Sequence, residues 1–333
     1  MYRYIGNKTR LLPEIRRIVQ ENVSENGTVA DIMAGTGTVS AELKRCGYRV
    51  IAADVMTYSR HHLVSQLLVN AAPEFKTLRD AGIVQRLGYS GVIEFLNKLP
   101  EQKSFFYNEF SADGAPQNGC PSRKYFTPEN AGKIDAIREE IELWRINGYI
   151  SIIEESVLKH TLILAVNRIA NISGTYGYFL SEYNSNSLEP LVLRPVDFVY
   201  SSRTDHTVLQ GFAEELAPEI EADLCYIDPP YMKRQYAANY HILETIARGD
   251  FPEAIGKSGL RNWWDQHSKL CTKTSGLKSL AKIMSEMRCP TFLISYSEDG
   301  LFTIEQLKEC FEAFGVVNIF EIEYTRFRSN NSP

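Results

Sequence analysis

Hydrophobic and polar positions follow a regular order near the amino-terminal end of the chain. The segment TVADIMAGTGTVSAELKRCGYRVIAADV, residues 28 to 55, begins with a short apolar run, passes two glycines and ends with a second apolar run. This pattern predicts a strand over 28–33, a short helix over 39–45 and a second strand over 48–53. A strand, a crossover helix and a second strand form a βαβ unit, which implies a parallel sheet.

The same pattern returns in the carboxyl-terminal part of the chain. Strands are expected at 224–227, 291–295 and 316–324, and helices at 239–248, 277–287 and 304–314. The two ends therefore predict one α/β domain with a Rossmann-like sheet and helices on both faces. We assign residues 1–72 and 194–333 to this domain.

The region between these two parts, residues 73–193, does not follow the βαβ pattern. Residues 111–126 are rich in Gly, Pro, Asn and Ser and predict an exposed loop. Thr127 and Pro128 are typical of a helix start, and a second, buried helix is expected at about 150–170. Residues 73–193 are thus predicted to form an inserted domain of helices and loops, of the kind that serves as a lid or a recognition module.

Composition limits the classes of protein to consider. With 333 residues, 44% of them hydrophobic, the chain is long enough for a packed core. No run approaches the ~18 apolar residues of a membrane helix, so a cytoplasmic protein without a membrane partner is expected. Six scattered cysteines indicate neither a disulfide framework nor a metal site. The net charge of -5 argues against coating nucleic acid through bulk charge, but a local basic cleft is compatible with it.

Two glycines follow the first predicted strand, at the point where such sheets bind nucleotides. Gly35 and Gly37 let a ligand approach the backbone without interference from Cβ atoms. Asp54 ends the second strand, where a carboxylate can accept hydrogen bonds from ribose hydroxyls. The third glycine of the dinucleotide fingerprint is replaced by Ser40, so the match to NAD enzymes is incomplete. The turn predicts a site for a ribose-bearing ligand.

The segment LCYIDPPYMKRQY, residues 224 to 236, predicts a second chemical group at the same edge of the sheet. Pro229 and Pro230 cannot donate to a strand ladder, so the strand stops and the chain turns. This displays the Asp228 carboxylate, the Pro229 carbonyl and the Tyr231 ring. Two acceptors and one flat ring suit a planar group with an amino substituent. Accepting both amine hydrogens makes the nitrogen nucleophilic, which is electrostatic stabilisation of a transition state.

Three motifs in a fixed order resemble those of a known family. The segment from Asp31 to Gly37 looks like motif I of S-adenosylmethionine-dependent methyltransferases, and Asp228-Pro-Pro-Tyr231 looks like motif IV of the amino-group DNA methyltransferases. Arg3-Tyr4-Ile5-Gly6-Asn7-Lys8 resembles motif X, which precedes motif I in the class α, or Dam-like, adenine-N6 enzymes. The resemblance covers nearly the whole chain and extends to the subset linked to restriction-modification.

The resemblance implies S-adenosyl-L-methionine as the cofactor and assigns residues to each part of it. Tyr4, Gly6 and Lys8 would hold the methionine end. Asp31, Gly35 and Gly37 would line the central part. Asp54 would bind the ribose, and Asp205 is the candidate for the adenine amino group.

The resemblance also implies double-stranded DNA as the partner. Asp228, Pro229, Pro230 and Tyr231 would form the catalytic motif, with Asp228 and Pro229 accepting hydrogen bonds from the target N6. The target adenine must be flipped out of the duplex, and stacking on Tyr231 would help offset the cost.

The inserted region would then be the target recognition domain, and four cationic side chains are candidate DNA contacts. These are Arg123, Lys124, Lys233 and Arg234. A cognate restriction endonuclease that acts independently is a further expected partner. The expected location is the cytoplasm of a prokaryotic cell, with nucleoid association through DNA.

Three other interpretations remain open at this level. A methyltransferase acting on an RNA base amine or on a protein glutamine can present a similar tetrapeptide, although such enzymes usually lack this insertion. A cytosine-N4 enzyme would more typically have serine in place of Asp228. A nucleotide-binding regulator without activity would keep the glycine turn but would have no use for an acceptor pair beside it.

Overall fold

Five parallel strands form the centre of the structure, which is a computed structural model that describes residues 8–86 and 88–322. Their order across the sheet is β3-β2-β1-β4-β5. The strands are β1 (Thr28–Asp31), β2 (Arg49–Asp54), β3 (Thr207–Gln210), β4 (Leu224–Ile227) and β5 (Phe292–Ile294). The register places Asp31 beside Tyr226 and Asp54 beside Gln210, so the carboxyl ends of these strands meet at one edge.

Helices cover both faces of the sheet because alternate side chains along each strand point to opposite sides. One face packs Val29, Val50 and Leu224 against helices of the amino-terminal part. The other packs Ala30 and Cys225 against helices from later in the chain. The helices around the sheet are α1 (Leu12–Asn22), α2 (Thr38–Arg45), α3 (Thr57–Leu63), the π-helical η1 (Val64–Leu68), α9 (Ala213–Leu216), η3 (Ala217–Glu219), α12 (Gly276–Glu286) and α13 (Ile304–Glu312). This arrangement confirms the predicted α/β fold.

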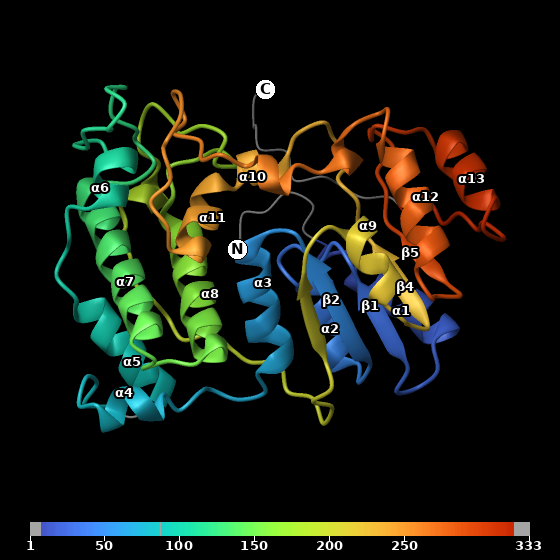
Figure 1. Cartoon of the computed structure of the whole chain (residues 1–333), viewed down its shortest axis with the longest axis horizontal. Helices are drawn as coiled ribbons and strands as arrows, with labels where there is room; N and C mark the ends of the chain where they lie inside the picture. Colours follow the sequence, from blue (N-terminus) through green and yellow to red (C-terminus); the bar gives the residue numbers. More distant parts are fainter. Residues whose placement is uncertain (1–7, 87, 323–333) are drawn as a thin grey trace.

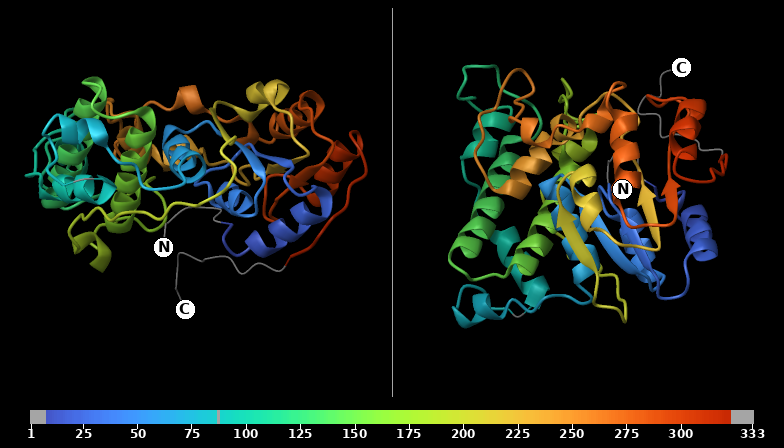
Figure 2. Two further views of the ribbon diagram at one scale, coloured as in Figure 1. Left: turned by 90° about the horizontal axis from the view of Figure 1, so that it is seen from below. Right: turned by 45° about the vertical axis from the view of Figure 1, so that its right-hand side comes forward.

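The inserted region stands beside the sheet, next to α3, as both Figure 1 and Figure 2 show. Its helices are α4 (Lys76–Asp80), α5 (Gly88–Lys98), α6 (Phe105–Phe110), α7 (Pro128–Ile146), α8 (Ile152–Ile169) and η2 (Ser185–Leu188). Thr127 caps α7 as expected, and Ser151 forms a capping box at the start of α8. None of the described helices is both long enough and apolar enough to cross a membrane.

The apolar core of the inserted region is shared with α10 (Tyr236–Asn239) and α11 (His241–Arg248), which follow the Asp228–Tyr231 segment. The short helices η4 (Trp264–Gln266) and η5 (Lys269–Cys271) come next, and Leu270 of η5 packs in the core on one face of the sheet. Leu243 and Ile246 of α11 lie in the same cluster as Trp144 and Leu162 of the insertion. The proposed domain boundary at residue 193 is therefore a boundary in the sequence. Although α11 follows that boundary in the sequence, in space it packs against the helices that precede it.

Two strand expectations differ from the structure. The strand β3 (Thr207–Gln210) was not expected, because its two apolar residues lie between polar ones and give a weak signal. In the expected strand at 316–324, the described residues 316–322 are not assigned to a strand, and the side chain of Val316 is 93% exposed. The apolar composition of this segment is typical of a strand, but a strand forms only where a neighbouring edge supplies its hydrogen bonds.

Candidate active site

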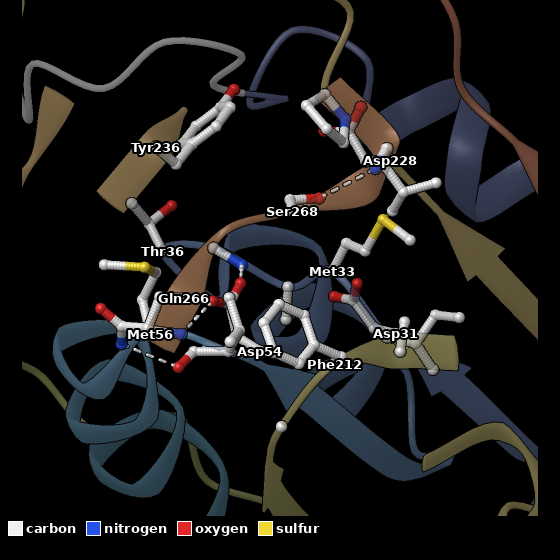
Figure 3. A pocket seen from close by; sticks show the side chains of 18 of the residues that line it. Asp31, Met33, Thr36, Asp54, Met56, Phe212, Asp228, Tyr236, Gln266 and Ser268 are labelled. Atoms are coloured by element: carbon white, nitrogen blue, oxygen red, sulfur yellow. Dashed lines mark hydrogen bonds between the residues drawn. The ribbon is translucent and has the colours of Figure 1, made fainter. Parts of the chain in front are cut away.

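A pocket opens at the carboxyl edge of the sheet, where β1, β2 and β4 end (Figure 3). We call it the carboxyl-edge pocket. Its lining brings together distant parts of the sequence, among them Lys8, Asp31, Gly35, Asp54, Met56, Phe212, Asp228, Pro230, Tyr236 and Gln266. Three carboxylates from three strand ends thus face one space.

The glycine turn after β1 has the geometry that the sequence predicted. Gly35 and Gly37 have φ values of 53° and 76°, a left-handed conformation that other residues adopt at a cost. A Cβ atom on Gly37 would lie 2.6 Å from the Gln66 side-chain oxygen. The Gln66 amide in turn donates to the Thr36 carbonyl at 3.0 Å. The turn therefore packs against η1 at Gly37, while Gly35 and Thr36 line the pocket.

Asp54 stabilises this turn from the neighbouring strand. Its carboxylate accepts hydrogen bonds from the backbone N–H of Gly35 and of Met56, both at 2.8 Å. Burial raises the pKa of Asp54 to about 6, and the two backbone hydrogen bonds oppose that rise. Asp54 thus connects β2 to the turn after β1, which places its carboxylate in the pocket lining.

Asp31 is the most isolated carboxylate of the pocket. Ser40 donates to Asp31 Oδ2 at 2.6 Å, whereas Asp31 Oδ1 is buried without a hydrogen-bond partner among the described residues. Burial raises the pKa of Asp31 to about 7, with the Ser40 hydrogen bond opposing and the charges of Asp228 and Asp54 adding to the rise. The position that departs from the dinucleotide fingerprint, Ser40, therefore serves to hold Asp31.

The pKa of Asp31 gives a testable pH dependence of stability. Between the ordinary value of 3.8 and about 7, the unfolded chain ionises this carboxyl while the folded protein keeps it protonated. The free energy of unfolding of the ligand-free protein should therefore fall as pH rises through this range. The free energy of unfolding of Asp31→Asn should fall less steeply with pH, because the asparagine amide does not titrate. Urea unfolding at a series of pH values checks this, and parallel profiles for the two proteins would contradict it.

Asp228 lies at the end of β4 and is held by two side chains. Lys8 Nζ lies 2.8 Å from Asp228 Oδ1, and the Tyr231 hydroxyl donates to the same oxygen. Burial raises the pKa of Asp228, while the Lys8 ammonium opposes the rise. Lys8 also contacts the Tyr231 hydroxyl and lies 4.7 Å from the centre of its ring. Lys8 and Tyr231, which are far apart in sequence, thus meet at one carboxylate.

Tyr231 has more contacts than the sequence indicated. Its hydroxyl lies 3.3 Å from the Ser295 hydroxyl, and its ring packs edge-on against Tyr296 at 5.4 Å between ring centres. Burial and the adjacent carboxylate raise its pKa. The ring is anchored at its hydroxyl end, and its use as a stacking surface for a base remains a prediction.

The predicted ligand residues fall into three groups. Tyr4 and Gly6 lie outside the described residues, while Lys8, Asp31, Gly35, Asp54, Asp228 and Pro230 line the pocket. The assignment of Asp205 is wrong. It precedes β3 at the opposite edge of the sheet, where it pairs with Arg203 at 2.7 Å, an interaction that lowers its pKa to about 2. Asp205 follows the apolar run 196–200, which suggested a strand end, but β3 begins two residues after Asp205, which places it before the strand and not after one.

The four predicted DNA contacts also differ in their surroundings. Arg123 is fully buried and pairs with Glu109 at 2.6 Å, so its assignment as a DNA contact is wrong. Lys124 is partly buried and donates to the Ser181 carbonyl at 3.1 Å. Lys233 and Arg234 are exposed just after the catalytic motif. A loop rich in polar residues suggested exposure at position 123, but a guanidinium can be buried where carbonyls and a carboxylate surround it.

Several residues of the site carried no recognisable signal in the sequence. Phe212 follows β3, Met56 follows β2, and Gln266 comes from a turn far along the chain. Gln266 donates to the Val55 carbonyl at 3.1 Å and to Glu244 at 2.8 Å. Glu244 is fully buried and accepts from the first N–H groups of α3, one of them that of Thr57. Tertiary packing alone brings these residues to the pocket.

Comparison with known proteins decides the family. Residues 4–321 match the model of the D12 class N6 adenine-specific DNA methyltransferases. The chain belongs to this family. The predicted family is thereby confirmed, and the family together with its Rossmann-like sheet implies a cofactor of the S-adenosylmethionine type.

Three relatives of this member of the D12 class are named as type II methyltransferases or modification methylases. It is 34% identical to the type II methyltransferase M.FokI of Planomicrobium okeanokoites, over 99% of this chain and 50% of that protein. It is 32% identical to the type II methyltransferase M.NlaIII of Neisseria lactamica, over 99% of this chain and 93% of that protein. It is 31% identical to modification methylase StsI of Streptococcus sanguinis, over 99% of this chain and 49% of that protein. The chain thus spans about half the length of M.FokI and StsI, and nearly the whole of M.NlaIII.

Proposed function

We propose that this chain transfers a methyl group from S-adenosyl-L-methionine to the N6 amino group of an adenine flipped out of duplex DNA. The observation that carries the proposal is the position of Asp228. Its carboxylate ends β4 beside the glycine turn, and both line one pocket. An amine acceptor and a nucleotide-type turn are thus brought together at the edge where open α/β sheets bind their ligands.

The described residues of the pocket fit such a cofactor. S-adenosylmethionine, when bound, supplies an electrophilic methyl group. Asp31 offers a buried oxygen without a partner, which suits a hydrogen-bond donor or a cation. Asp54 lies where a carboxylate can accept from ribose hydroxyls, and Gly35 leaves the backbone accessible. Phe212 and Met56 add apolar surface, which suits the flat adenine ring.

Asp228 would act on the target by accepting hydrogen bonds from its N6 amino group. The Lys8 ammonium favours the ionised carboxylate, and an ionised carboxylate is the stronger acceptor. Accepting hydrogens from the amine shifts electron density onto its nitrogen, and the carboxylate then stabilises the positive charge that develops there. Pro229 would supply the second acceptor through its carbonyl oxygen. In the described conformation Lys8 and Tyr231 both contact Asp228, so substrate entry requires these two side chains to make room.

DNA would approach the exposed side of this edge. The cations of Lys233 and Arg234 follow the catalytic motif and are exposed, which suits contacts with phosphates beside the flipped base. Tyr231 is close enough to Asp228 to contact a base whose amino group reaches that carboxylate. The similarity to type II modification enzymes supports a role beside an independent restriction endonuclease, in a cytoplasmic protein that associates with the nucleoid through DNA.

Methylation of defined DNA tests the proposal. The purified protein, incubated with radiolabelled S-adenosylmethionine and duplex DNA, should produce N6-methyladenine at one sequence context. Mass spectrometry of the digested DNA identifies the base, and long-read sequencing of DNA from expressing cells identifies the context. Label in RNA or in a protein glutamine, with none in DNA, would favour the alternative substrates. Label on cytosine would contradict the assignment of adenine.

A further inference from the structure

Three aromatic rings form a stack on the surface close to the carboxyl-edge pocket. The ring centres of Trp263 and Trp264 lie 4.9 Å apart, with 20° between their planes. His267 lies 5.3 Å from Trp264 and 5.9 Å from Trp263, again nearly parallel. Trp264 is 68% exposed, whereas Trp263 packs against the core of the insertion. The stack therefore presents a large flat aromatic surface that is fixed from behind.

Hydrogen bonds connect this stack to the pocket and to the catalytic motif. Gln266, between Trp264 and His267 in sequence, lines the pocket and donates to the Val55 carbonyl. The Gln235 amide donates to the Ser268 carbonyl at 3.0 Å, and its oxygen accepts from the Ser268 N–H at 2.9 Å. The segment that carries the aromatic stack thus lies beside the residues that follow Tyr231.

Exposed cations lie on the two segments that meet at Ser268, next to the aromatic stack in sequence. Lys233 and Arg234 lie on the segment bonded to Ser268, and Lys269 and Lys273 follow the stack in sequence; all four are exposed. Two acidic residues also lie near Trp264. Asp265 pairs with Arg248 at 2.8 Å, although Arg248 also pairs with the buried Glu244, and Glu253 lines the same surface hollow as Trp264. A flat aromatic surface with cations beside it is the combination that binds unpaired bases through stacking and their backbone through phosphate contacts.

We propose that Trp264, held by Trp263 and His267, stacks on a base of the DNA substrate that has lost a stacking neighbour. The inference rests on the proposed function and deepens it, because extruding one nucleotide leaves unstacked bases at the site. The ring is large, flat and fixed in place, and the neighbouring cations complement a polyanion rather than an apolar protein surface. Trp264 would therefore contribute to DNA affinity without contacting the cofactor.

Substitution of Trp264 tests the inference. Trp264→Ala should weaken binding of duplex DNA and raise its KM by about tenfold. Trp264→Phe, which keeps a flat ring, should recover most of this loss. Cofactor affinity, measured by calorimetry, and thermal stability should stay close to wild type in both. Tyr200→Ala is the matched control, because Tyr200 is 73% exposed on the segment leading into β3, and it should bind DNA normally.

Tryptophan fluorescence supplies a second readout. The chain has three tryptophans, and Trp144 is only 1% exposed. Duplex DNA should quench the wild-type emission, and Trp264→Ala should lose most of that quenching, because Trp144 is buried and Trp263 is half-buried against the core.

The outcomes separate this inference from the proposed function. A wild-type protein that methylates adenine, with Trp264→Ala equal to it in DNA affinity and quenching, would overturn only the stacking surface. Failure of the wild-type protein to methylate any DNA would overturn the proposed function. Loss of DNA affinity in Trp264→Ala that Trp264→Phe does not restore would also contradict stacking, because a purely structural role would then explain the loss.

Discussion

Asp228→Ala is expected to lower the rate of methyl transfer by a factor on the order of 10³ or more, to the limit of detection. The substitution removes the acceptor that ends β4 and leaves the Lys8 ammonium beside the pocket without its carboxylate partner. A cation at that position would repel the charge that develops on the target nitrogen. The rate is measured as transfer of radiolabel from S-adenosylmethionine to duplex DNA in single-turnover reactions.

Cofactor binding should survive this substitution, because Asp31, Asp54 and the glycine turn do not depend on Asp228 for their hydrogen bonds. Calorimetric titration with S-adenosylmethionine measures it. Asp205→Ala is the matched control, since it removes a carboxylate from the opposite edge of the sheet, and it should leave the rate close to wild type. Full activity in Asp228→Ala would reject the proposed role of this residue.

Arg123→Ala is expected to lower the free energy of unfolding by about 3–5 kcal/mol, the cost of removing one partner of a buried ion pair. Glu109 would keep a buried charge without its cation. The guanidinium also donates to the carbonyls of Lys257 and Gly256, so the loop at 254–257 would lose these two hydrogen bonds and keep the one from Asn118 to the Ala254 carbonyl. Urea unfolding followed by circular dichroism measures the change.

Lys124→Ala supplies the comparison for Arg123. Lys124 is the neighbouring cation, partly buried and bonded to one carbonyl, so its loss should cost no more than about 1 kcal/mol. The double substitution Arg123→Met with Glu109→Leu should recover part of the stability lost in Arg123→Ala, because it leaves no unpaired charge. Equal stability of Arg123→Ala and wild type would show that the guanidinium contributes nothing to the fold.

The core of the site could be predicted because its residues follow strand ends in the sequence. Gly35, Gly37 and Asp54 belong to one βαβ unit, whose geometry is local, and Asp228 comes directly after an apolar run stopped by two prolines. Parallel strands place their carboxyl ends at one edge of the sheet, so these residues come close together once the sheet forms. The order of the motifs added the family and its cofactor, which the family match supports.

Other residues of the site required the tertiary structure. Gln266 and Phe212 reach the pocket from turns whose position depends on how distant helices pack. Lys8 and Asp228 are 220 positions apart in the sequence (228 − 8). Only the folded chain brings them into contact.

What the sequence determined by itself is the set of elements and motifs with a local cause: the βαβ unit, the glycine turn, the strand stop at Pro229 and the helix start at Thr127. What only the tertiary structure decided is which residues are buried and at which edge of the sheet each one lies. Arg123 and Asp205 were both expected to contact ligands, yet one is enclosed by carbonyls and the other lies at the wrong edge. Burial depends on which segments cover a residue, and those segments are distant in sequence, so no local pattern reports it.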